Sequence, residues 1–192
     1  HPAAACLTYL VPGLRFFYEG QFEGRQVRVP VQLQRRPVER VNPTIRAFYD
    51  KLLAWLKRPE LREGTWRLWE CEPAWEGSTS QQSLIAFSWS AEATELAATG
   101  PTTRAPRASA VAVDAEVDRA VSWLKLLVVV NYGPSPAQAF IPLPNVAWPQ
   151  ETVHLHDLMT GTDYPRQADD LNKHGLYVDL PPWGTHVLDV RE

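Results

Sequence analysis

The sequence predicts a mainly β protein with some helix, an antiparallel β-sandwich that follows a short helix–strand–helix segment. Two patterns lead to this prediction. From Gly64 onward, short segments with an apolar period of two residues alternate with turn-forming clusters, which is typical of a sandwich. Before Gly64, an apolar run lies between two helical segments, which is typical of one α/β repeat. A single repeat is too short to close a barrel of its own.

The first part of the chain is organised around the run Leu-Arg-Phe-Phe-Tyr at residues 14–18. A Pro-Gly pair opens this run, and Gly20 and Gly24 close the segment that follows it. An apolar run whose one polar residue is Arg15 predicts a strand that is buried on both faces, as in a parallel sheet. Residues 2–11 are apolar nearly all round and predict a buried helix.

A second helix is predicted after Asn42, because asparagine is a favourable N-cap and Pro43 suits the first helical position. Pro59 is expected to stop it. Its apolar side chains recur at the spacing of one helix face and are Ile45, Phe48, Tyr49, Leu52, Leu53 and Leu56. We expect this face to pack against the sandwich or against neighbouring helices. Residues 25–41, which precede the helix, contain many arginines and Pro30 and predict an extended loop or an edge strand.

Short strands separated by turn clusters are predicted in the second part of the chain. They cover residues 66–71, 84–90, 126–131, 137–143, 152–158, 176–180 and 185–190. Residues 91–120 interrupt this rhythm with a stretch rich in Ala, Thr and Pro, which we interpret as a flexible insertion with a short helix near residues 114–120. The chain is therefore divided into residues 1–60 and a β-domain at residues 61–192.

The composition excludes several classes of protein. The 192 residues include 19 basic and 22 acidic side chains, and the net charge of −3 gives no electrostatic footprint for nucleic acid or for an anionic membrane. No apolar run approaches the roughly 20 residues that cross a bilayer. Cys6 and Cys71 are too few for a disulfide framework and are predicted to be buried free thiols, which favours a reducing, cytoplasmic location.

Three segments together resemble the C-terminal part of the α-amylase family of glycoside hydrolases. Residues 13–21, Gly-Leu-Arg-Phe-Phe-Tyr-Glu-Gly-Gln, are similar to the segment at that family's eighth barrel strand, and the helix with its Asn-Pro start resembles the eighth barrel helix. Residues 157–161 and 175–184 are similar to the closing hairpins of the family's C-terminal β-domain. Arg15 stands where the family usually has proline, and Phe22 stands where it usually has glutamate, with Glu23 adjacent.

The resemblance implies that residues 1–60 are the end of a (β/α)8 barrel, a TIM barrel remnant, and that residues 61–192 are its C-terminal domain, a β-sandwich of Greek-key type. Because the sequence starts at His1, inside the first predicted helix, we expect a fragment of a longer enzyme. The parent enzyme would hydrolyse or transfer α-glucosidic bonds in carbohydrate metabolism.

The same resemblance places the catalytic residues outside this chain. A retaining glycosidase needs two carboxylates about 5 Å apart. In this family the nucleophile, the general acid and a third aspartate follow the fourth, fifth and seventh barrel strands, so all would precede His1. We expect an inactive chain that needs no cofactor and meets an α-glucan or maltooligosaccharide only through the parent enzyme. Its expected partners are the missing N-terminal barrel portion or, without it, a second copy of itself.

Four polar residues follow the predicted barrel strand and are candidates for substrate binding: Glu19, Gln21, Glu23 and Arg25. The end of a barrel strand is where this architecture keeps its binding groups, and carboxylates and amides hydrogen-bond sugar hydroxyls in pairs. The residues would line the sugar cleft or brace its floor. The alternative is a solvated loop with structural ion pairs.

The eight tryptophans raise a second function, because an aromatic face packs against the apolar face of a pyranose. Trp75, Trp148 and Trp183 lie in predicted turns, and Trp75 and Trp183 are the candidates for binding sugar. The other tryptophans lie in regular elements, where core packing is the default. The rival hypothesis is therefore a non-catalytic glucan-binding β-sandwich module.

A third hypothesis, a small metallohydrolase, rests on His154 and His156, which share one face of a predicted strand with Asp157 next to them. Zinc would need a third ligand, for which His174 and His186 are available. No ligand spacing is distinctive, and the sequence therefore predicts no metal site.

Overall fold

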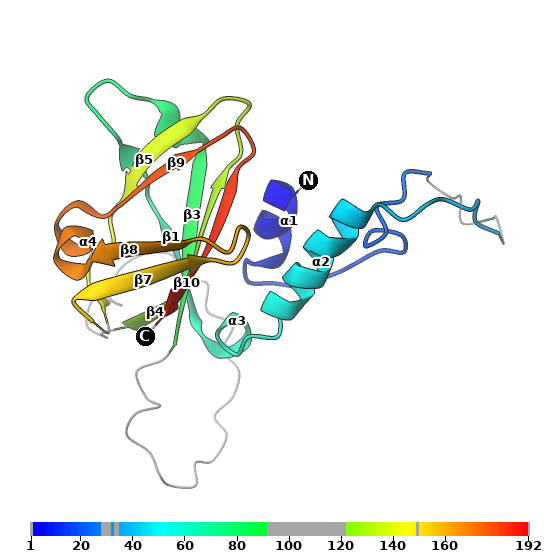
Figure 1. The fold of residues 1–192 in the computed structure, drawn as a ribbon, viewed down its shortest axis with the longest axis horizontal. Coiled ribbons are helices and arrows are strands. Elements are labelled where there is room, and N and C mark those ends of the chain that lie inside the picture. The colour runs from blue at the N-terminus through cyan, green and yellow to red at the C-terminus, as the bar shows by residue number, and fades with distance from the viewer. Residues whose placement is uncertain (1, 28–31, 33–34, 92–121, 149, 192) are drawn as a thin grey trace, which may run out of the picture.

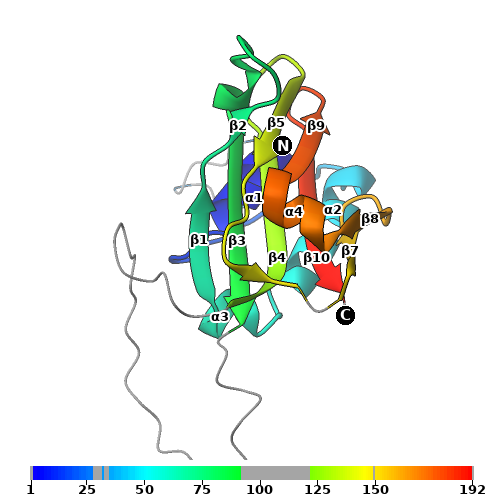
Figure 2. The ribbon, with the colours of Figure 1, turned by 90° about the vertical axis from the view of Figure 1, so that its left-hand side faces the viewer.

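The computed structural model describes residues 2–27, 32, 35–91, 122–148 and 150–191. The described chain forms three layers: helices, a seven-stranded sheet and a three-stranded sheet. Figure 1 shows the helices α1 and α2 together on one side of the strands. Figure 2, viewed from the side away from these helices, shows α1 behind the large sheet.

The helices are short. They are α1 (Pro2–Tyr9), α2 (Pro43–Trp55), α3 (Glu60–Glu63) and α4 (Ala168–His174), with a 3-10 turn η1 at Ser80–Ser83. The predicted start of α2 is confirmed, because the Asn42 side chain accepts hydrogen bonds from the backbone N–H groups of Thr44 and Ile45 at 3.1 and 3.2 Å. None of the described helices is long and apolar enough to cross a membrane.

The large sheet has the order β1-β3-β4-β10-β7-β8 and is antiparallel along this path. Its strands are β1 (Thr65–Trp69), β3 (Leu84–Ala91), β4 (Ser122–Asn131), β7 (Thr152–Asp157), β8 (Asp163–Gln167) and β10 (Thr185–Arg191). The two-residue β6 (Val146–Ala147) pairs with β4 in parallel. The small sheet is antiparallel in the order β2-β5-β9, with β2 (Glu72–Pro73), β5 (Ala137–Ile141) and β9 (Leu176–Leu180).

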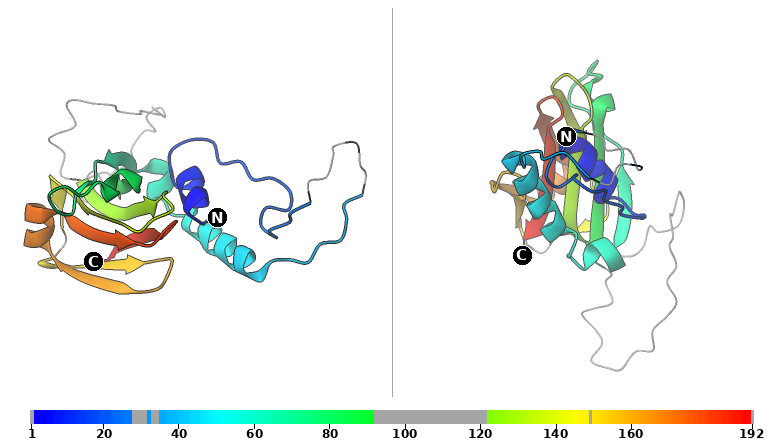
Figure 3. Two further views of the ribbon diagram at one scale, coloured as in Figure 1. Left: turned by 90° about the horizontal axis from the view of Figure 1, so that it is seen from above. Right: turned by 90° about the vertical axis from the view of Figure 1, so that its right-hand side faces the viewer.

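Each face of the large sheet is covered by a hydrophobic core. The sandwich core lies between the two sheets and is built from alternate residues of β5 and β9, of which Ala139, Ile141 and Val178 are examples. The helix-side core lies on the opposite face, where Cys6 of α1 and Leu52 of α2 pack with residues of β3, β4 and β10. Figure 3 shows α1 and α2 beside the stacked strands. The large sheet is therefore the central layer of the molecule.

The predicted antiparallel, mainly β class is confirmed, and every predicted strand of the second part overlaps an observed strand. Six elements were not predicted: β2, β6, β8, α3, α4 and η1. All but β8 are too short to show periodicity, and β8 contains Pro165, which disfavours a strand away from a sheet edge. The predicted insertion at residues 91–120 lies outside the described residues, apart from its first position.

The strand predicted at residues 14–18 is wrong for the described chain. The backbone there is extended but makes no ladder with another described strand. The segment follows α1 and precedes α2, and no described strand pairs with it. Three of its side chains are exposed rather than buried. The described parts of residues 25–41 likewise form no strand.

Candidate functional site

The segment at residues 14–25 holds four of the six predicted site residues and connects α1 with α2. It follows the C-terminal end of α1 and runs past α2 (Figures 1 and 3). Gly24 lies against Ile45 in the first turn of α2. Gly24 has a φ of 65°, in the left-handed region that favours glycine. A backbone hydrogen bond of 2.9 Å from Asn42 N to the Glu23 carbonyl fixes this junction.

Two side chains of the segment point inward and hold it to the helices. The Arg15 guanidinium donates to the carbonyl of Tyr9 at 2.8 Å and to that of Leu61 at 3.0 Å, so it satisfies the last turn of α1. Burial, together with the nearby Arg62 charge, lowers the pKa of Arg15. The Phe17 ring stacks on Tyr9 with centroids 4.3 Å apart.

Gln21 is the polar centre of this region. Its side chain is 6% exposed. Its amide nitrogen donates to the hydroxyls of Tyr9 at 2.5 Å and Tyr49 at 2.8 Å, and its oxygen accepts from the Tyr18 N–H at 3.3 Å. One amide thus joins α1, α2 and the connecting segment. Of the two roles predicted for Gln21, its geometry suits bracing the floor of a site rather than contacting a ligand.

The charged candidates lie on the surface of the same segment and pair with each other or with neighbouring arginines. The Glu19 carboxylate lies 2.9 Å from Arg36 and 3.8 Å from Arg25. Glu23 lies 3.8 Å from Arg46. Exposed pairs of this kind contribute at most about 1 kcal/mol to stability. The Glu19 carboxylate is exposed at the surface, whereas Glu23 and Arg25 are partly buried.

The outward side of the segment is an apolar stripe, Leu14, Phe16 and Tyr18. These side chains are 93%, 72% and 61% exposed, whereas Arg15 and Phe17 between them are partly buried. An extended backbone places alternate side chains on opposite sides, so the stripe is the outer face of a strand-like segment. Its inner face is already packed on the helices.

The two predicted sugar-stacking tryptophans are both exposed, Trp75 by 57% and Trp183 by 50%. Trp148, the third turn tryptophan, donates its indole N–H to Asn172 at 2.9 Å and packs on the sandwich core. Trp183 has a φ of 58°, in the left-handed region. For a bulky residue this conformation costs about 1–2 kcal/mol. Because their side chains are exposed, both Trp75 and Trp183 remain available to a ligand.

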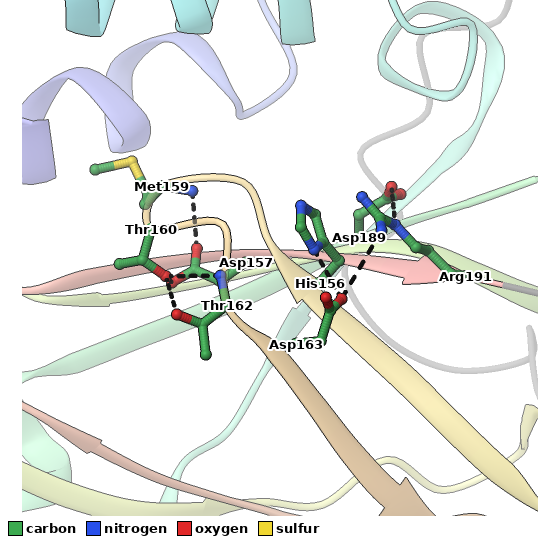
Figure 4. A network of polar contacts seen from close by, with 8 residues as sticks. All are labelled: His156, Asp157, Met159, Thr160, Thr162, Asp163, Asp189 and Arg191. Atoms are coloured by element: carbon green, nitrogen blue, oxygen red, sulfur yellow. Dashed lines mark hydrogen bonds and ion pairs between the residues drawn. The ribbon is translucent and has the colours of Figure 1, made fainter.

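A polar network that the sequence did not predict surrounds Asp157 at the end of β7 (Figure 4). The Asp157 carboxylate is fully buried and accepts hydrogen bonds from Met159 N at 2.9 Å, Thr160 Oγ1 at 3.0 Å and Val187 N at 3.3 Å. His186 Nδ1 lies 2.9 Å from the same carboxylate. Burial alone would raise the pKa of Asp157, but the hydrogen bonds, led by that of His186, lower it below its ordinary value.

This network positions the β7–β8 turn against the helices. The Met159 carbonyl accepts a hydrogen bond of 3.0 Å from Lys51 Nζ on α2. The Met159 side chain packs on the helix-side core. The Asp157 side chain therefore stabilises a turn that docks on α2, and its hydrogen bonds account for its burial without a ligand.

The histidines considered for zinc do not converge in the described structure. His156 Nδ1 lies 2.7 Å from Asp163, and His174 lies on α4, 3.8 Å from Asp170. Among the described residues, no group of three or more His, Cys, Asp or Glu side chains is placed to hold a metal ion. Cys6 and Cys71 are free thiols.

Sequence reasoning missed Tyr9, Tyr49 and Asp157 as members of polar networks. The only available signal was a polar atom on an otherwise apolar helix face for the tyrosines, and a turn-forming position for Asp157.

In the comparisons with known proteins, no family model matches the chain and no curated protein is significantly similar to it.

Proposed function

We propose that the chain is the C-terminal region of an α-amylase-like glycoside hydrolase that acts on α-glucans. In this proposal residues 1–60 complete a (β/α)8 barrel and the β-sandwich covers its flank. The role of the chain is structural, and the catalytic carboxylates lie in the preceding part of the enzyme. The free cysteines agree with a reducing, cytoplasmic location.

The apolar stripe is the observation that carries this proposal. Leu14, Phe16 and Tyr18 project from an extended backbone whose opposite side is fixed by Arg15 and by the Gln21 amide. A segment with this shape is preorganised to lie beside further strands. Burial of each stripe side chain in such a contact contributes about 1.5–3 kcal/mol.

The order of the elements supports the same reading. A helix, an extended apolar segment, and a second helix with an Asn-Pro start precede an antiparallel sandwich, in the order that the α-amylase resemblance implies. The candidates Glu19, Glu23 and Arg25 lie at the far end of the extended segment, where a barrel would place them at the mouth of its sugar cleft.

The stripe can be tested on the chain as it stands. We expect light scattering to detect self-association, and an apolar dye to bind, because the stripe is exposed in isolation. The triple variant Leu14→Ser, Phe16→Ser and Tyr18→Ser should be monomeric and bind less dye. Tyr177→Ser, which removes an exposed aromatic side chain of β9, is the matched control and should behave as the parent. A monomeric parent that binds no dye would contradict the proposal.

The gene gives an independent test. The reading frame upstream of His1 should encode barrel strands that end in an aspartate nucleophile and a glutamate acid. Linking or adding the encoded segment should produce hydrolysis or transfer of α-glucosidic bonds, which the chain alone should lack. An upstream region that encodes no such strands would refute the assignment.

A glucan-binding role of the sandwich itself is the second candidate function. The exposure of Trp75 and Trp183 favours it. The two functions are compatible, since a flanking β-domain can both cover a barrel and hold substrate.

A further inference from the structure

Trp183 occupies the turn between β9 and β10 in a backbone conformation that suits glycine, with a φ of 58°. Among the described residues, the only other non-glycine residue with positive φ is Asn145, and asparagine tolerates this region far better than tryptophan. Trp183 is half exposed and belongs to neither the helix-side nor the sandwich core, so core packing does not explain a tryptophan in this conformation. Strain of this kind is characteristic of functional positions.

The turn that carries Trp183 is held rigidly by Asn131, a fully buried side chain at the end of β4. The Asn131 amide nitrogen donates to the carbonyls of Ser135 at 2.8 Å, Leu180 at 3.2 Å and Pro181 at 2.9 Å. Its oxygen accepts from Gly133 N at 3.0 Å. One side chain thus fuses the turn after β4 with the turn after β9, so little conformational entropy remains to be lost on binding.

The two fused turns present an aromatic corner, Tyr132 and Trp183. Their ring centroids are 5.4 Å apart and their planes meet at 85°, an edge-to-face pair. Each side chain is 50% exposed. The backbone hydrogen bond of 3.2 Å from Trp183 N to the Gly133 carbonyl sets the position of one ring relative to the other. The corner therefore offers two fixed aromatic surfaces to solvent.

The chemistry of the corner selects an uncharged ligand. Residues 132–136 are Tyr-Gly-Pro-Ser-Pro and residues 181–184 are Pro-Pro-Trp-Gly, so neither turn carries a charged side chain. Phosphates and nucleic acids need basic groups, which both turns lack. A pyranose has an apolar face that packs on an aromatic ring and hydroxyls that reach neighbouring carbonyl and serine oxygens.

We propose that the Tyr132–Trp183 corner binds the glucosyl units of an α-glucan, outside the catalytic cleft of the parent enzyme. The identity of the sugar rests on the proposed function, whereas the existence of the site rests on the strained, anchored turn. The corner holds a glucan chain on the β-domain and gives this otherwise structural region a substrate-binding role.

Affinity electrophoresis of the whole chain in gels with and without amylose tests the site, and titration with maltoheptaose while following tryptophan fluorescence gives the affinity. We expect retardation of the parent chain and a change in its fluorescence. Trp183→Gly and Trp183→Ala should weaken binding by about tenfold or more, the loss expected when an aromatic contact is removed. Tyr132→Ala should have a smaller effect in the same direction.

Trp183→Gly is the sharpest variant, because glycine suits the left-handed backbone and the chain should fold at least as well as the parent. Loss of glucan binding with unchanged or raised thermal stability therefore separates a ligand role from a structural one. Tyr177→Ala, which removes a comparably exposed aromatic side chain of β9, is the matched control and should leave binding unchanged.

Three results would overturn the inference: no retardation of the parent chain, retardation that survives Trp183→Gly, or binding of a proline-rich peptide in place of maltoheptaose. Loss of self-association in Trp183→Gly would instead assign the corner to a protein interface and would also overturn it. The three binding results do not depend on the apolar stripe, which is tested by its own triple variant. Failure of the site and failure of the proposed function are therefore distinguishable.

Discussion

The two faces of the large sheet differ in how they are completed. The sandwich core is enclosed by two sheets of the chain itself, with buried side chains such as Ile141 and Leu155. The helix-side core is enclosed by α1 and α2 but is bordered by the extended segment whose outer side is the apolar stripe. One core is therefore closed by two sheets, whereas the other is closed by helices and borders an exposed apolar stripe.

The largest expected effect is the cost of truncating a sandwich-core side chain. Ile141 is fully buried, and Ile141→Ala should lower the free energy of unfolding by about 2–5 kcal/mol through lost burial and the cavity left behind. Leu14→Ala removes a comparable side chain from the exposed stripe and should change it by less than about 0.5 kcal/mol. Urea denaturation measures both values, and similar costs at the two positions would break the comparison.

The next effect concerns the polar junction that holds the extended segment. Gln21→Leu removes the amide that donates to the Tyr9 and Tyr49 hydroxyls, so the loss of these buried hydrogen bonds should lower the free energy of unfolding by about 1–3 kcal/mol. Glu19→Gln, at an exposed ion pair of the same segment, serves as the control and should be nearly neutral. Equal stability of the parent and Gln21→Leu in urea would show that the junction does not hold the segment.

The third prediction concerns the pH dependence of stability, which we expect to depend on Asp157 in the turn between the large sheet and α2. Its pKa is lower in the folded chain than in the unfolded one, so in acid the unfolded state binds the proton more readily. The stabilisation is complete above the unfolded pKa of about 4 and is lost as the pH falls through the lower folded pKa. The free energy of unfolding should therefore fall less steeply in acid for Asp157→Asn than for the parent chain. Asp50→Asn, on the surface of α2, should leave this pH dependence unchanged.

The smallest effects are expected in the reactivity of the two cysteine thiols. Cys6 lies on the helix side and Cys71 lies beside the sandwich core, so each thiol reports on one half of the molecule. Burial, with the nearby Asp157 carboxylate, raises the pKa of Cys6 on α1 to about 12, and burial raises the pKa of Cys71 beside the sandwich core to about 11. Both thiols should react slowly with a disulfide reagent at pH 8.

Urea should separate the two thiols. In single-cysteine variants, Cys6 should become reactive at urea concentrations below the global transition, because the helix α1 that carries it is only eight residues long and adjoins the segment with the exposed stripe. Reactivity of Cys6 that rises only in step with global unfolding would show that the two halves are equally stable. The thiols would then provide no support for a difference in stability between the two halves.

The sequence was sufficient where a local signal decides the structure. The Asn42 cap and the apolar face of α2 define that helix, and alternation of apolar residues defines β5, β7 and β9. The proline within β8 concealed a strand, because Pro165 is tolerated only where the strand forms the edge of the sheet. The order of the strands in the two sheets could not be predicted from local sequence patterns.

The candidate site was less predictable, since its residues depend on neighbours distant in sequence. Gln21 was expected near a ligand but lies among tyrosines of two helices, and a local pattern does not reveal this burial. The exposure of Trp183 was expected from its turn, whereas the Asn131 anchor beneath it was not. The run at residues 14–18 predicted a buried strand, and its exposure depends on which other strands are present rather than on its own composition.

Because the large sheet carries a core on each face, the boundary near residue 60 does not mark a place where the chain can be trimmed. Removing the residues before it would uncover Phe87, Val128 and Val187, all fully buried against the helices. We therefore expect a β-domain shortened for crystallisation or fusion to aggregate and to be poorly soluble. The smallest unit that folds stably should retain both N-terminal helices.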